Sequence, residues 1–200
     1  MPKLIETDRG IISIRQAVPD DSARLRELRI EALSDSPVAF SADLEAARVE
    51  AAGNWSERLR AYEAENQGLI CVAEVQDRLV GMCGLYCGDR PKTRHSGMIW
   101  GVFVSPSWRG LRIADILIEE CLAWGQDHGV VVAKLGVNTG NIPAIRCYTR
   151  CGFSVFGIEP KAIYYEGVYY DELLMAVILP DQIAFWPAST PQDPSSSRTA

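Results

Sequence analysis

Histidine is scarce in this sequence, and cysteines at close metal-binding spacing are absent. There are two histidines, His95 and His128, and no Cys-x-x-Cys pair, so the usual ligand set of a structural zinc site is missing. Cys147 and Cys151 stand four residues apart and could share a helical face, but with so few partners we expect no metal. An even number of cysteines could form disulfides, yet apolar surroundings favour reduced packing residues for all six: Cys71, Cys83, Cys87, Cys121, Cys147 and Cys151.

Long apolar runs and strongly basic segments are also lacking. No uncharged apolar stretch approaches the roughly 20 residues of a membrane span, and the N-terminus lacks the basic-then-apolar pattern of a secretory signal. The formal net charge is −6 and no basic cluster occurs, which argues against a nucleic-acid-binding surface. We therefore expect a cytoplasmic protein that binds neither membranes nor nucleic acids.

The apolar periodicity that is present predicts an α/β fold with a mixed sheet, because it contains both a hairpin and strands joined by helices. The run over residues 98–104 is almost continuously apolar, which is typical of a central strand buried on both faces. Other strands are expected over residues 10–16, 69–75, 79–87, 130–137, 153–157 and 169–179. Helices are expected after Pro19, over residues 55–64, from Ser107 to near Gly129, and over residues 142–150.

The length of the chain, 200 residues with 48% hydrophobic content, suits one well-packed domain, which we place over residues 1–180. Residues 181–200 are expected to form a C-terminal tail. Its Pro- and Ser-rich end cannot bury enough apolar area to offset the entropy of ordering, so we expect the last ten or so residues to be disordered.

The most informative segment is the junction of the apolar strand with the following helix, around Arg109-Gly110. Backbone N–H groups at the start of a helix lack partners and, with the helix dipole, favour an anion such as phosphate. Arg109 and Arg112 could add charged hydrogen bonds to phosphate oxygens. Taken alone, the segment fits equally well a surface arginine pair beside an ordinary helix.

A second segment lies downstream, where Asn141, Ala144 and Tyr148 are spaced to lie along one face of a short helix. Pro143 suits the first turn of that helix, where a missing N–H has no cost. A phenol beside a substrate cleft can protonate a leaving group. By itself, however, a helical tyrosine is more often a packing residue.

In this order, the two segments resemble the GNAT superfamily of N-acetyltransferases, over roughly residues 10–179. The first is similar to the family's Gln/Arg-x-x-Gly-x-Gly/Ala turn, and the second to Asn-x-x-Ala-x-x-x-Tyr-x-x-x-Gly-Phe, which ends here at Gly152-Phe153. Residues 167–175 resemble a Gly-x-Tyr-x-Asp-x-x-x-Met ending of many members. The resemblance implies a central mixed sheet of six to seven strands flanked by about four helices.

The resemblance also implies an activity: acetyl transfer from acetyl-CoA to an amine of a small molecule or peptide, by direct attack, in a monomer or homodimer without a metal. Tyr148 would be the general acid that faces the cofactor sulfur, and backbone donors would polarise the carbonyl. The strand would hold the pantetheine arm, the turn the pyrophosphate, and Asn141 the cofactor arm. The cofactor-binding residues implied are Val102, Phe103, Val104, Arg109, Gly110, Leu111, Arg112, Ile113, Ala114, Asp115, Asn141 and Tyr148.

Two positions depart from the family pattern. Arg112 replaces the central glycine of the turn; it either takes a helical conformation without cost and adds a phosphate contact, which we favour, or crowds the site. Asp115 places a negative charge nearby, and we expect it to point outward. An acidic residue that some members carry five positions before the Asn is Gly136 here, so no general base is evident.

Candidate bases are Glu74, Glu166 and Asp171, each acting through water, and each more commonly an ordinary carboxylate. Cys147 adjoins Tyr148 and suggests an acyl-cysteine, but adjacent helical residues point about 100° apart, so we expect only Tyr148 to face the cofactor. Tyrosines around residues 166–167 could lie over the acceptor end of the cleft, or reflect strand propensity alone.

Two other functions compete with acetyl transfer as interpretations of the sequence. A dinucleotide-binding oxidoreductase needs a glycine-rich turn after the first strand, and residues 16–19 contain no glycine. A catalytically weak GNAT-like protein that binds acyl-CoA as a sensor is the more serious alternative, because of Arg112 and the missing acid.

Overall fold

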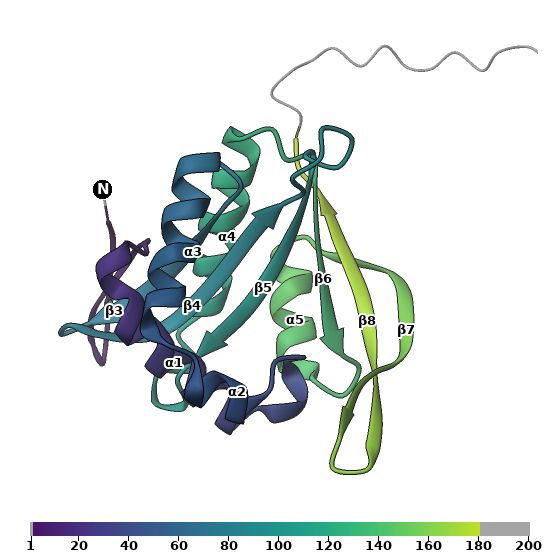
Figure 1. Ribbon diagram of the computed structural model, residues 1–200, viewed down its shortest axis with the longest axis horizontal. Helices are drawn as coiled ribbons and strands as arrows, with labels where there is room; N and C mark the ends of the chain where they lie inside the picture. The colour runs from purple at the N-terminus through teal and green to yellow at the C-terminus, as the bar shows by residue number, and fades with distance from the viewer. Residues whose placement is uncertain (1, 181–200) are drawn as a thin grey trace, which may run out of the picture.

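The computed structural model describes residues 2–180, which form one eight-stranded sheet in the order β1-β2-β3-β4-β5-β6-β8-β7 (Figure 1). Neighbouring strands are antiparallel except for β5 and β6, which are parallel. The expected mixed α/β sheet is therefore confirmed. The strands are β1 (Lys3–Thr7), β2 (Gly10–Gln16), β3 (Gly68–Val75), β4 (Arg78–Cys87), β5 (Ser96–Val104), β6 (Val132–Asn138), β7 (Ser154–Tyr165) and β8 (Val168–Ile178).

Helices cover both faces of the sheet, and each face has its own apolar core. On one face, Leu25 and Leu28 of α1 and Trp55 of α3 pack on the strands; on the other, Leu117 and Cys121 of α4 do so. The helices are α1 (Ser22–Asp35), α2 (Leu44–Val49), α3 (Ala52–Glu65), α4 (Ile113–Asp127) and α5 (Ile142–Arg150), with 3₁₀ turns η1 (Pro19–Asp21), η2 (Pro37–Ala39) and η3 (Pro106–Trp108). Within residues 2–180, none of these helices has the length and apolar character needed to cross a membrane.

The expected count of six to seven strands is wrong, because β1 adds an eighth. Its five residues form a hairpin with β2 through Thr7↔Gly10, and its mixed, largely exposed sequence gives little apolar signal. β7 is also much longer than the expected 153–157, with register irregularities at Val155/Gly157 and Glu159/Ile163 that interrupt its alternation. The expectation for a disordered tail concerns residues outside those that the structure describes.

The feature that positions the site is the divergence of β5 from β6. The two strands pair only from Ser96↔Val132 to Met98↔Lys134 and then separate. A β-bulge lies just beyond, where the register with β4 shifts and Gly101 has φ +64°, and bulges bend a strand. Beyond Met98, the backbone groups of β5 that face β6 have no strand partner. β5 is central as expected, but it is only partly buried from Trp100 to Val102 because it borders a cavity.

Candidate active site

A cavity of about 650 Å³ lies where β5 and β6 diverge. Residues of β5, the turn before α4, β6, α5 and η2 line it. Of the twelve residues implied to bind the cofactor, all but Leu111 are in this lining, and Leu111 instead packs against the apolar core. The structure thus brings together two sequence segments that lie about 30 residues apart in the chain.

The turn before α4 presents unpaired backbone donors to the cavity. The first helical hydrogen bond runs from Ile116 N to Arg112 O, and the N–H groups of residues 110–114 donate to no acceptor among the described residues. Gly110 has φ +86°, and Arg112 is left-handed at φ 59° and ψ 22°. The expectation that Arg112 is helical without cost is therefore wrong: it takes the left-handed conformation that glycine normally supplies, at a cost of about 1–2 kcal/mol.

Among the residues that the structure describes, some arginines of the site form ion pairs within the protein, and others do not. Arg109 donates from Nε to Val104 O (2.9 Å), forms an ion pair with Asp35 of α1, and lies over the Phe103 ring. Its guanidinium thus fastens the turn to α1. Arg112 and Arg146 are exposed, line the cavity, and form no ion pair with a described residue. They are the cations available to an anionic ligand.

Asp115 is buried, which contradicts the expectation that it points outward. Its Oδ1 accepts from Arg150 Nε (2.6 Å) and its Oδ2 from Arg150 Nη2 (2.9 Å), so a two-pronged ion pair joins α4 to α5. Burial works against the charged carboxylate, but the hydrogen bonds from Arg150 and the Cys147 thiol outweigh it and lower the pKa of Asp115. The pair neutralises the negative charge near the turn.

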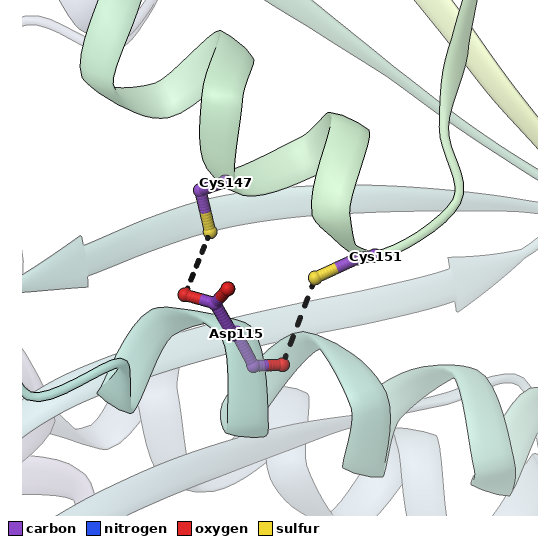
Figure 2. A group of neighbouring side chains, drawn as sticks. All are labelled: Asp115, Cys147 and Cys151. Carbon is purple, nitrogen blue, oxygen red and sulfur yellow. Dashed lines mark hydrogen bonds between the residues drawn. The ribbon is translucent and has the colours of Figure 1, made fainter.

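Figure 2 shows the thiols of Cys147 and Cys151 pointing toward Asp115. Cys147 Sγ lies 3.4 Å from Asp115 Oδ2, and the three potential ligand atoms lie within 4.8 Å of one another. Because Arg150 already occupies both carboxylate oxygens, a thiophilic cation would have to displace it. Sequence spacing identified the two cysteines but could not identify Asp115 as their neighbour.

Cys147 and Tyr148 both line the cavity, but the Cys147 thiol points toward Asp115 (Figure 2), and the expectation that only Tyr148 faces the cofactor stays a prediction. The adjacent Cys151 thiol, burial and the Asp115 carboxylate all raise the pKa of Cys147, which keeps it a protonated, weakly nucleophilic thiol. Both the orientation of this thiol toward Asp115 and its electrostatic surroundings oppose an acyl-cysteine at this position.

Tyr148 lies in a buried position on α5. Asn141 caps this helix by accepting from Ala144 N (3.2 Å), and the Tyr148 ring packs edge-on against Phe153. Burial, with nearby thiols and the Glu172 carboxylate, raises the pKa of Tyr148, so its hydroxyl is protonated at neutral pH. That hydroxyl forms no hydrogen bond with a described residue and is free to act on a ligand.

None of the three carboxylates considered as bases lines the cavity. Glu74 is held by Arg15 and Arg24, Glu166 lies in the exposed β7–β8 turn, and Asp171 accepts from Lys161 N. The tyrosines near this turn are also absent from the lining; Tyr164 and Tyr169 pack on one another, with ring centroids 4.8 Å apart.

Glu172 is the acidic residue that sequence reasoning missed. A Cβ built at Gly136 would collide with Glu172 Oε2, so this carboxylate fills the space above the glycine that stands at the family's acidic position. Glu172 pairs with Asn138 across β6 and β8 and therefore shares its face of the sheet. That is the η2 face, because Asn138 Nδ2 donates to Val38 O (3.3 Å). Burial and the opposing Glu159 raise the pKa of Glu172.

Comparison with known proteins identifies the family. A profile of the acetyltransferase (GNAT) family matches residues 30–153. The chain belongs to this family. It is therefore an enzyme of the N-acetyltransferase type, within a family that transfers acyl groups.

Curated relatives of this GNAT enzyme include an L-amino acid N-acetyltransferase of Escherichia coli K12, 29% identical over 126 residues that cover 61% of this chain and 74% of the relative. A streptothricin acetyltransferase of E. coli is 34% identical over 58 residues, which are 29% of this chain and 33% of the relative. The chain thus spans only about a third of that second protein.

Solved structures share the GNAT fold. An acetyltransferase of Streptococcus pneumoniae has a TM-score of 0.77 and 22% identity, over 84% of this chain and 99% of its own. A phosphinothricin acetyltransferase of Sinorhizobium meliloti in complex with acetyl-CoA has a TM-score of 0.76 and 18% identity, over 89% and 94%. At these identities the likeness concerns the fold alone.

Proposed function

We propose that this GNAT enzyme transfers an acetyl group from acetyl-CoA to a primary amine by direct attack. The observation that carries the proposal is the placement of a free Tyr148 hydroxyl on the α5 side of the cavity and of the Glu172 carboxylate over Gly136, a lining residue; Glu172 itself lies just outside the lining, on the η2 face of the sheet. Glu172 is near enough to Tyr148 to raise its pKa electrostatically. A proton donor and a proton acceptor therefore approach the point where β5 and β6 diverge from opposite faces.

The cavity suits the acyl donor. The unpaired N–H groups of residues 110–114 and the free cations Arg112 and Arg146 match a pyrophosphate. The edge of β5 at Val102 and Phe103 has no strand partner on the β6 side and offers backbone groups to an amide-containing arm, whereas Val104 O already accepts from Arg109 Nε. Asn141 has a side-chain NH₂ group without a described partner. Two solved structures of the family's fold hold acetyl-CoA, which agrees with this assignment.

Acetyl-CoA supplies, when bound, an activated thioester whose carbonyl an amine nitrogen attacks and whose thiolate departs. Because most alkylamines are protonated at neutral pH, Glu172 accepts the proton that must leave the amine. Its raised pKa brings it closer to neutral, where a general base is most effective. Tyr148 donates its phenolic proton to the leaving sulfur and is reprotonated by the second proton that the amine nitrogen loses as the amide forms. Proton removal and proton donation thus fall to residues on β8 and α5.

The relatives named above act on amines as different as amino acids and streptothricin, so the family alone leaves the acceptor open. A monomer or homodimer, and a cytoplasmic location, stay predictions.

The test incubates the purified chain with acetyl-CoA and a panel of amino acids, amines, peptides and aminoglycosides while free thiol is measured. We expect acceptor-dependent release that falls at least tenfold in Tyr148→Phe, with Tyr165→Phe on the exposed hairpin as the matched control. Stabilisation by CoA without turnover on any acceptor would instead favour the sensor. If CoA does not bind, both the acetyltransferase and the acyl-CoA sensor proposals are refuted.

The pH profile tests Glu172 separately. In the wild type, kcat/KM should rise with pH as Glu172 loses its proton, and Glu172→Gln should lower kcat/KM about a hundredfold and abolish this limb. Glu159→Gln removes the opposing charge, so the same limb should move to lower pH with activity retained. An unchanged limb in Glu172→Gln would assign the base elsewhere.

A further inference from the structure

Besides the unpaired groups that line the cavity, a buried side-chain donor without a hydrogen-bond partner among the described residues lies beyond the η2 end of the cavity. Arg29 of α1 has its Nη1 buried without a hydrogen-bond partner, and no described carboxylate forms an ion pair with it. Buried polar atoms in proteins nearly always have partners, so the unpaired Nη1 of this half-buried arginine is unusual. An acceptor atom supplied by a ligand would satisfy this donor.

The position of Arg29 ties it to the cavity wall. Its guanidinium carbon lies 4.6 Å from the centroid of the Phe40 ring, and its Nη1 lies 4.0 Å from where a Cβ at Gly101 would stand. Phe40 and Gly101 both line the cavity. Arg29 is not itself a lining residue, and the partly exposed Phe40 ring lies between its guanidinium and the cavity, so access to Arg29 requires this ring to move.

The surroundings of Arg29 favour an anion. Arg58 of α3 lies nearby, with its guanidinium over the Trp55 and Trp100 rings, and its charge affects the pKa of Arg29 more than the opposing charge of Glu50 does. Burial first, and then the charge of Arg58, lower the pKa of Arg29 to about 10, so it is still charged at neutral pH. The adjoining part of the lining consists of Ser36, Ala39, Phe40, Trp100 and Gly101, which offers apolar and aromatic contacts and no acidic group.

We propose that Arg29 binds a carboxylate of the acceptor, so that the enzyme acetylates amino acids or related amines that carry a free carboxylate. A planar carboxylate matches the two parallel donors of a guanidinium better than other common anions. The amine would then extend toward Gly136 and Glu172, which lie on the same face of the sheet. Phe40 and Trp100 would contact the apolar part of the acceptor. This assignment rests on the acetyl transfer proposed above.

The experiment compares L-amino acids with their amides and with the corresponding decarboxylated amines, for example phenylalanine, phenylalaninamide and phenethylamine. Wild-type kcat/KM should favour the acid by about thirtyfold or more, the loss typical of an unpaired buried charge. Arg29→Met should remove this preference by raising KM for the acid while KM for acetyl-CoA is unchanged. Arg60→Met, which removes an exposed charge from α3, is the matched control and should keep the preference.

A binding measurement keeps the inference independent of turnover. Calorimetric titration of phenylalanine and of its amide into the protein saturated with CoA should give binding of the acid alone, and none in Arg29→Met. Equal turnover of acid, amide and amine, or equal binding of acid and amide, would overturn the carboxylate site and leave the acetyltransferase proposal intact. Absence of thiol release with every acceptor would refute the proposed transfer, while selective binding of the acid would still support the site.

Discussion

The left-handed backbone of Arg112 predicts opposite effects of one substitution on stability and on ligand binding. Arg112→Gly relieves a strain of about 1–2 kcal/mol, offset by about 0.5–1 kcal/mol from the greater freedom of glycine in the unfolded chain. The free enzyme should therefore gain about 0.5–1 kcal/mol, or about 1–4 °C in the midpoint of thermal unfolding. The same change removes a free cation beside the unpaired N–H groups, so CoA should bind about tenfold more weakly.

Two further variants separate strain from charge. Arg112→Ala loses the cation but keeps a left-handed non-glycine residue, so its midpoint should not rise while its CoA affinity falls to the same extent. Arg112→Lys should keep affinity within about threefold. Thermal unfolding without ligand and calorimetric titration of CoA at low salt are the assays, because screening weakens exposed charges. Equal midpoints for the Gly and Ala variants would refute the strain argument, and unchanged affinity in the Ala variant would refute the charge argument.

Two other predictions concern carboxylates. Asp21 has a fully buried side chain that pairs with Arg15 and Arg24, so Asp21→Asn should lower the free energy of unfolding in urea at pH 7 by about 3–5 kcal/mol. The hydrogen bonds and charges of these arginines lower the pKa of Asp21 despite its burial. The stability that the Asp21 carboxylate contributes is therefore present above pH about 4 and is lost as the pH falls further. A difference in unfolding free energy between the wild type and Asp21→Asn that grows in acid would contradict the pairing. Gly136→Ala places a methyl group where Glu172 Oε2 lies, so kcat/KM should fall toward that of Glu172→Gln with the fold retained by circular dichroism; full activity would show that the carboxylate position is not needed.

The sequence predicts best those elements whose signals are local. α5 begins and ends where expected because its cap, Asn141, and its first-turn proline both act within four residues. The β3–β4 hairpin follows from two apolar runs around a tight turn. β1 and the far half of β7 depend instead on pairing with a neighbouring strand, since their own residues are largely exposed. Local propensity therefore gives no clear signal for them.

The same distinction holds within the site. The lining residues on β5, the α4 turn and α5 follow from motif spacing, but the partners of their side chains do not. The sequence predicts that Arg109 contacts phosphate, whereas in the structure it forms an ion pair with Asp35, which lies 74 residues earlier in the sequence. Asp115 was expected in solvent, and Arg150 holds it in the interior from another helix. Ion pairs between elements set both orientations, and a single sequence does not reveal which charges will meet.

Glu172 illustrates how a functional group can be hidden by strand register. Side chains alternate along a strand, so Asp171 and Glu172 must face opposite sides of the sheet, and the sequence alone does not say which of them faces the site. The pairing of Asn138 with Glu172 decides it, because Asn138 is anchored to η2 on that face. A shift of one residue would have placed Asp171 above Gly136 instead. The missing acid on β6 is thus compatible with catalysis, since a carboxylate from β8 reaches the same space, and glycine at position 136 leaves room for it.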